Sequence, residues 1–248
     1  MLDLNELSIN FTDQTRWGSL ILVEIAVFTV FLINLFPGLA APLHRLVILI
    51  HELGHATTTQ ITGGEAKGIV VNPKVKDGVY GVSIREGGNP YFILPAGYLA
   101  PTLFSVGLIL LSILPFCAVF TLVAVGLIMI VSTLRFGLTT FTRLLGLGFG
   151  ALLILVALKA DLFWSMFLLF LVAVQTGFTA LASLKELGDI VRNDPKGEST
   201  DDATRMAKQF KRWPLLSSPM FWVRLWTLFS FLALLGSIWF TWLRGIVA

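Results

Sequence analysis

Long apolar segments separated by short polar or Gly- and Pro-containing stretches constrain this chain more than any other feature of its sequence. Seven such segments run at about residues 17–36, 41–60, 91–114, 116–134, 144–158, 162–187 and 221–243. A helix of about 20 apolar residues crosses a hydrocarbon core of about 30 Å. Only 13% of the residues are charged, against roughly 25% in soluble domains. The sequence therefore predicts an all-α polytopic membrane protein with about seven transmembrane helices.

A metal-ligand pattern, His51-Glu52-Leu53-Gly54-His55, lies near the end of the second apolar segment. Two histidines four residues apart on a helix lie about 40° apart around its axis, so both imidazoles can reach one ion while the glutamate faces the open coordination position. A chance match to a short pattern is the alternative interpretation. Because ionisable groups are costly inside a membrane and by default functional there, we favour a metal site with a general base.

The pattern changes to β between residues 68 and 85. Ile69-Val70-Val71 and the run from Val79 to Ile84 flank two turn signals, Asn72-Pro73 and Asp77-Gly78, which predicts a hairpin directly after the second apolar segment. The hairpin is interpreted either as an ordinary loop outside the membrane or as an edge strand that pairs with an extended substrate. The sequence favours neither.

A catalytic zinc ion usually takes three protein ligands and a water, so the two histidines need a partner. Acidic candidates near the end of the sixth apolar segment are Glu186, Asp189, Asp194, Asp201 and Asp202. The last three lie in or beyond a predicted helix stop and flexible loop, which favours solvated charges. Asp189 is flanked by apolar residues and Gly188, where an unpaired carboxylate is costly. It is the preferred third ligand, against the alternative of a helix-end charge that faces water.

Together these segments resemble the site-2 protease family of intramembrane zinc metalloproteases, and more narrowly its small peptidase-like branch. The resemblance rests on the His-Glu-Leu-Gly-His pattern, the hairpin, Pro95-Ala96-Gly97-Tyr98-Leu99, and Gly188-Asp189-Ile190. It covers roughly residues 40–205 and implies His51, His55 and Asp189 as ligands of one Zn²⁺, with Glu52 as catalytic base. Better-known members have Leu-Asp-Gly where this chain has Gly-Asp-Ile. The downstream Ser199-Thr200-Asp201-Asp202-Ala203 also resembles an acidic stretch of the branch.

The predicted function is an intramembrane zinc endopeptidase that hydrolyses peptide bonds within or next to transmembrane segments, with Glu52 as general base on a zinc-bound water. Substrate-binding residues stay unknown, although Tyr98 and Asn89 are candidates. One alternative is a catalytically silent zinc-binding scaffold, which would not need Glu52. A cation transporter is the other, although it would need charged or polar groups on several helices along a path, and the third, fourth and seventh segments are nearly devoid of ionisable groups. The expected partners are transmembrane protein substrates and the lipid bilayer, with no nucleic acid.

Three further features have structural interpretations. The single cysteine, Cys117, excludes an intramolecular disulfide and a cysteine-based zinc cluster. Gly146, Gly148 and Gly150 are typical of helix–helix contacts rather than of a phosphate loop. Glu24 in the first segment has either a snorkelling or helix-contact role, or a gating role near the site.

The distribution of the 18 Lys and Arg residues predicts the orientation. With seven spans, most of them fall on the side of the N-terminus, and the other side keeps Arg45, Lys159 and Arg244. The N-terminus is therefore predicted to be cytoplasmic and the C-terminus outside, in a bacterial-type plasma membrane. The expected organisation is a cytoplasmic segment 1–16, a membrane-embedded core 17–220 with hairpin 68–85 and cytoplasmic loop 185–220, and a C-terminal transmembrane helix 221–248.

Overall fold

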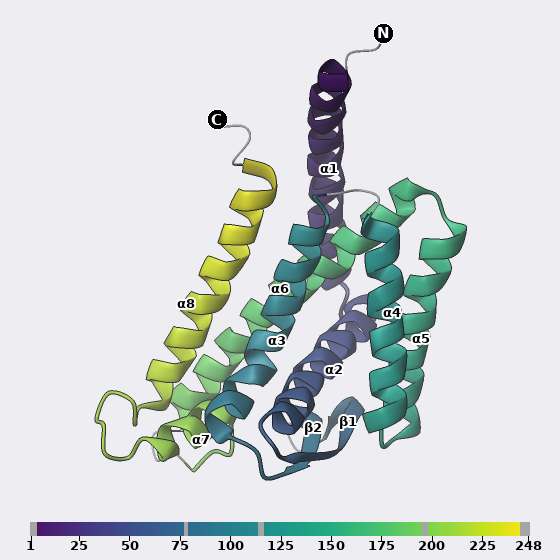
Figure 1. Ribbon diagram of the computed structural model, residues 1–248. Helices are drawn as coiled ribbons and strands as arrows, with labels where there is room; N and C mark the ends of the chain where they lie inside the picture. Colours follow the sequence, from purple (N-terminus) through teal and green to yellow (C-terminus); the bar gives the residue numbers. More distant parts are fainter. Residues whose placement is uncertain (1–3, 77–78, 114–116, 195–197, 244–248) are drawn as a thin grey trace.

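The computed structural model describes residues 4–76, 79–113, 117–194 and 198–243, and consists mainly of helices (Figure 1). In chain order its elements are α1 (Leu4–Asn34), α2 (Pro37–Ile61), β1 (Glu65–Lys76), β2 (Val79–Glu86), α3 (Pro90–Leu111), α4 (Cys117–Phe136), α5 (Thr140–Lys159), α6 (Leu162–Asn193), α7 (Asp202–Gln209), α8 (Pro219–Ile238) and the π-helical turn η1 (Trp239–Leu243). The prediction of an all-α polytopic membrane protein with a small hairpin is confirmed. The expected domain boundaries stay a prediction.

Each of the seven apolar segments forms a helix, but α1 and α2 do not each pass as a candidate span on their own. Within the described residues, α3, α4, α5, α6 and α8 are each long and apolar enough to cross a membrane. Residues Gly18–Asn34 of α1 and Pro37–Ile61 of α2 pass the same test only as a pair, and the pair is bent by 112°. Pro37 begins α2 and supplies no backbone N–H, which favours a new helix start at this point. By length and composition, the described residues thus hold five candidate spans, or six if the bent pair is one broken span, which is roughly consistent with the predicted number of about seven.

The two ends of the described chain lie at the same end of the bundle (Figure 1). The first turns of α1 and the last turn of α8 are at the upper end of this view, whereas the hairpin and α7 are at the lower end. This arrangement fits six crossings. The predicted placement of the N- and C-termini on opposite sides, which counted α1 and α2 as two crossings, stays a prediction.

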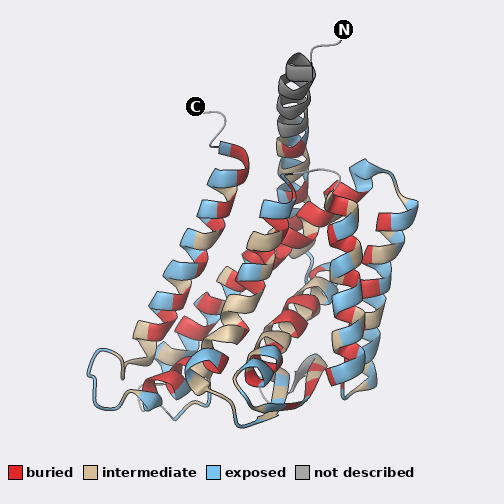
Figure 2. Ribbon diagram, viewed as in Figure 1, coloured by how far each residue is buried: buried red, intermediate tan, exposed pale blue. Residues whose placement is uncertain are grey.

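Buried residues are concentrated on α2 and on the inward faces of the helices around it (Figure 2). Gly54 of α2 lies so close to α3 that a Cβ there would be 2.5 Å from the Ala96 carbonyl oxygen. On α5, Gly146 and Gly150 face α4, while a Cβ on Gly148 would meet nothing within 4 Å. The helix-contact interpretation of the glycine run therefore holds for two of its three members.

The hairpin lies where the sequence predicts it, against the C-terminal half of α2. β1 and β2 pair antiparallel as a two-stranded sheet, with Ile69 opposite Ser83 and Val71 opposite Gly81. The turn signal Asp77-Gly78 lies outside the described residues. Ile69 and Val71 are buried, whereas Tyr80, Val82 and Ile84 of β2 are partly exposed. β1 thus packs into the protein, and β2 forms the outer strand.

Candidate metal centre

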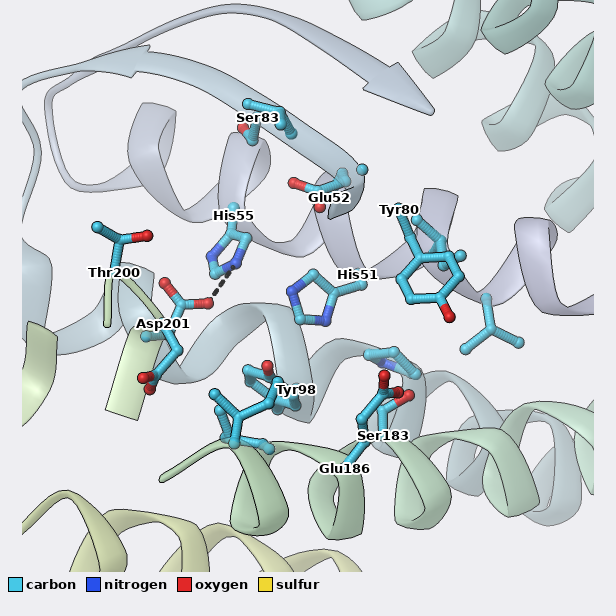
Figure 3. Close-up of a pocket in the computed structure, with 18 of the residues that line it drawn as sticks. His51, Glu52, His55, Tyr80, Ser83, Tyr98, Ser183, Glu186, Thr200 and Asp201 are labelled. Atoms are coloured by element: carbon cyan, nitrogen blue, oxygen red, sulfur yellow. Dashed lines mark ion pairs between the residues drawn. The ribbon is translucent and has the colours of Figure 1, made fainter. Parts of the chain in front are cut away.

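The two histidines and the glutamate lie on one helix, α2, as their spacing predicts. Glu52 and His55 are buried, and His51 is partly buried. The imidazole rings of His51 and His55 are 4.8 Å apart between centroids and nearly perpendicular. Figure 3 shows both rings and Glu52 on the α2 side of a cavity, with Tyr98, Ser183 and Glu186 on other walls.

Gly97 of α3 leaves open the space in front of both histidines. A Cβ at this position would collide with the Nε2 atoms of His51 and His55 and lie 2.6 Å from Cε1 of His55. Next to it, the ring of Tyr98 packs edge-on against His51 at 4.7 Å and stacks on Trp226 of α8. The helix therefore holds the rings in place on one side and leaves room for an ion on the other.

A backbone carbonyl fixes the orientation of His55. Its Nδ1 is 2.7 Å from the carbonyl oxygen of Ile93. Because a carbonyl oxygen can only accept, Nδ1 carries the proton and donates, which leaves Nε2 as the atom available to an ion. The same arrangement orients many metal-ligating histidines.

Asp202, the first residue of α7, lies opposite the histidines. Its Oδ2 is 3.1 Å from Nε2 of His55. One ligand atom each from His51, His55 and Asp202 lie within 4.8 Å of one another. The burial of Ala203, Met206 and Ala207 against Trp222, Val223 and Trp226 of α8 holds α7, and with it Asp202, at the cavity.

Two arginines flank the other carboxylate oxygen of Asp202. Arg85 of β2 and Arg205 of α7 each approach Oδ1 at 3.9 Å. Burial alone would raise the pKa of the Asp202 carboxyl, but its contact with His55, the nearby His51 and the charge of Arg85 together outweigh this effect and hold the pKa below its usual value. Asp202 is thus held as a carboxylate, the form that can bind a cation.

Asp189, the preferred third ligand on sequence grounds, does not lie in this group. It is on α6, and its side chain is 53% exposed and 3.5 Å from Arg192 one turn later. This is the alternative that the sequence left open, a helix-end charge that faces water. The interpretation of Asp202 as a solvated charge is corrected in turn, because its side chain is only 13% exposed and contacts His55.

The remaining acidic candidates have other positions. Glu186 of α6 lines the cavity but is exposed. Asp194 accepts hydrogen bonds from the backbone N–H groups of Glu198 and Ser199, and Asp201 caps the N-terminus of α7 through the N–H of Thr204. Glu24 lies exposed on α1. Asn89, a substrate-binding candidate, instead caps α3 by accepting from Tyr91 N–H.

The cavity has a volume of about 620 Å³ and lies between α2, β2, α6 and the start of α7. β2 passes close over Glu52, since a Cβ on Gly81 would lie 2.9 Å from Oε1 of Glu52, and the backbone amide of Ser83 interacts with the same carboxylate. Tyr80, Val82 and Arg85 of the strand line the cavity as well. The potential base therefore lies directly beneath a strand whose far edge has no neighbouring strand among the described residues.

Two imidazole nitrogens and one carboxylate oxygen form a donor set that zinc prefers, as in the His₂-carboxylate sites of metallopeptidases. The space in front of Gly97 and the fixed tautomer of His55 fit the same ion. These residues could hold Zn²⁺ and leave one coordination position facing the cavity and Glu52.

Comparison with known protein families matches residues 23–237 to the family described as Peptidase M50B-like. The chain belongs to this family. It is thereby a peptidase of the site-2 protease family, as the resemblance of its motifs implies. Neither the search of curated proteins nor that of solved structures found a match.

In this M50B-like peptidase, sequence reasoning named Asp202 as a candidate ligand but interpreted it as a solvated charge. It gave Gly97 and the Ile93 carbonyl no role at the candidate centre. For Asp202 a signal was present, since Asp201 before a short amphipathic run is a typical N-cap and predicts a helix that begins at the next residue. For Gly97 and Ile93 no local signal exists, because their roles depend on how α3 packs against α2.

Proposed function

We propose that this peptidase is an intramembrane zinc endopeptidase that cuts membrane-protein substrates within or next to their transmembrane segments. His51, His55 and Asp202 hold one Zn²⁺, and Glu52 is the general base. The observation that carries the proposal is the convergence of these four side chains on one cavity, from two elements far apart in the chain. The family match supports it independently.

A Zn²⁺ ion held by His51, His55 and Asp202 would supply a Lewis acid that activates water and polarises the scissile carbonyl. Glu52 accepts a proton from the attacking water and delivers it to the nitrogen of the leaving amine as the C–N bond breaks. Burial of Glu52 at 6% exposure keeps bulk water from competing for that proton. Arg85 holds Asp202 in position and the Ile93 carbonyl holds His55, so little reorganisation is needed during the reaction.

The position of β2 supports substrate binding by strand addition. A helical substrate must unwind before its backbone carbonyl is accessible, and an unpaired strand edge offers hydrogen-bond partners to the unwound segment. Because neighbouring residues of a strand point their backbone groups to opposite sides, only alternate substrate N–H groups would be used. The exposed side chains of Tyr80, Val82 and Ile84 border this edge.

The charge distribution supports a cytoplasmic opening of the cavity. Basic residues gather at the end of the bundle that carries the hairpin and α7, at Arg85, Arg135, Arg143, Arg192, Arg205 and Lys208. Under the positive-inside rule this end faces the cytoplasm. Both ends of the described chain then lie on the outer side, which revises the earlier prediction for the N-terminus.

The decisive experiment reconstitutes the purified protein with helical transmembrane peptides and compares wild type with Glu52→Gln. We expect cleavage by wild type and a loss of at least about 100-fold in the variant, the lower range for removal of a general base. Zinc content should stay equal, because Glu52 is not a ligand.

Strand addition is tested with substrate peptides N-methylated at alternate backbone positions. Methylation in one of the two registers should slow cleavage by about 2- to 10-fold, because it removes one hydrogen bond, and methylation in the other register should have no effect. Equal cleavage by wild type and variant would refute the protease proposal, and equal cleavage of all methylated peptides would refute strand addition alone.

A further inference from the structure

A second cavity of about 520 Å³ lies between the C-terminal end of α6, the body of α7 and the N-terminus of α8. No residue lines both this cavity and the proposed catalytic one. The helix ends that line it lie at the end of the bundle that carries the hairpin (Figure 1). The proposed protease mechanism does not use it.

Three cations line the second cavity: Arg192 of α6, Lys208 of α7, and Lys211 just beyond α7. Among the described residues, no ion pair within 4.0 Å involves either lysine. In the same part of the chain, the only ion pair of Arg192 is with the exposed Asp189, and such a surface pair contributes little to stability. The one acidic residue in the lining, Asp194, directs both oxygens to backbone N–H groups of residues 198 and 199. The cavity therefore has a strong excess of positive charge.

Neutral groups in the lining add hydrogen-bonding capacity without a protein partner. Thr204 is 2% exposed, and its buried Oγ1 makes no hydrogen bond within the described chain. Such a buried hydroxyl is costly unless a ligand or water satisfies it. Ser218, the N-cap residue of α8, makes no side-chain capping bond. The N-terminal end of α8, with its partial positive charge, points toward the same space.

The surroundings of this cavity are suited to a membrane surface. The connection between α7 and α8 exposes Trp213 by 65% and Leu215 by 66%. Trp at a helix end typically lies at the level of lipid headgroups. Basic pockets between helices at the cytoplasmic face are suited to phosphate-bearing headgroups. We propose that this cavity binds the phosphate of an anionic phospholipid, through Arg192, Lys208, Lys211 and the hydroxyl of Thr204.

The test uses the full chain in neutral detergent, titrated with phosphatidylglycerol or phosphatidylcholine. Bound lipid is counted by native mass spectrometry, and the thermal unfolding midpoint Tm is followed in parallel. We expect saturable binding of phosphatidylglycerol that raises Tm, and no comparable effect of phosphatidylcholine. The double variant Lys208→Gln with Lys211→Gln should bind phosphatidylglycerol about 30-fold more weakly. Each cation near a membrane surface strengthens binding by about fivefold, and two cations are lost. Thr204→Val should weaken binding by a smaller factor.

The matched control carries Lys159→Gln and Lys185→Gln, the same charge change at exposed lysines that line neither cavity. Equal loss of binding in both double variants, or none in either, would overturn the proposed site. A third titration, with inorganic phosphate, distinguishes a lipid headgroup from free phosphate. A rise in Tm with inorganic phosphate as large as the rise with phosphatidylglycerol would overturn the lipid as ligand. None of these measurements depends on proteolysis, so their outcome is independent of the proposed catalytic function.

Discussion

A missing methyl group at Gly97 leaves the space in which the two histidines of α2 can share an ion. Gly97→Ala would put Cβ against both Nε2 atoms, so we expect zinc content to fall sharply while the helices remain folded. Gly107→Ala on the same helix is the matched control, because a Cβ there meets nothing within 4 Å. Zinc is measured by mass spectrometry of the metal, and folding by circular dichroism. A Gly97→Ala protein with full zinc content would contradict the proposed position of the ion.

Asp202 and Asp189 give opposite expectations at the same scale. Asp202→Ala removes a proposed ligand and should weaken zinc binding by more than about 100-fold. Loss of a residue that only supports a metal ligand already lowers metal affinity by about 10- to 100-fold. Asp189→Ala removes only an exposed pair with Arg192 and should leave zinc binding unchanged. Competition with a chelator of known affinity measures both. The reverse result would restore Asp189 as the ligand.

The residue scale also shows how far sequence reasoning reached into the centre. His51, Glu52 and His55 lie within one helical turn or so of each other, so their spacing alone predicted their common direction. The choice between Asp189 and Asp202 depended on which carboxylate is buried. That is decided by the packing of Ala203 and Met206 against α8, which has no local signature. Apolar neighbours in the sequence did not predict burial correctly for Asp189, because Ile190 beside it is itself 44% exposed.

At the scale of elements, close packing between α4 and α5 depends on glycines that face the partner helix. A Cβ on Gly150 would lie 2.6 Å from the backbone oxygen of Gly126. Gly150→Ala should therefore destabilise the protein by about 1–3 kcal/mol, the usual cost of overpacking. Gly148→Ala faces open space and should be neutral or slightly stabilising, because Ala favours helix over Gly by about 0.5–1 kcal/mol. Thermal unfolding in detergent compares them, and equal Tm values would refute this contact.

Element types were predicted well because hydrophobic runs and turn residues are local properties. The seven apolar segments became helices, and the β pattern at residues 68–85 became β1 and β2. The bend between α1 and α2 was not predicted. Pro37-Gly38 marked a break, but whether a break starts a new crossing or bends an existing one depends on contacts of α1 with α6 and of α2 with α3.

At the scale of the whole molecule, six crossings would put both ends of the described chain on one side. Reporter domains fused before α1 and after α8 should both report the outer side, and a reporter in the connection between α7 and α8 should report the cytoplasm, as the basic residues there require. The measurement is a dual reporter that is active on one side only. Opposite signals from the two ends would instead support seven crossings and a cytoplasmic N-terminus.

The residues of the candidate metal centre come from α2 and α7, so they are synthesised at different times. Ribosomes deliver the chain from the N-terminus, at about 5–20 residues per second, so α2 enters the membrane long before Asp202 has been made. Throughout that interval His51, Glu52 and His55 lie among other membrane proteins without their proposed third ligand. A nascent or truncated chain would thus be harmless to its neighbours, and proteolytic competence would begin only when nearly the whole protein is complete.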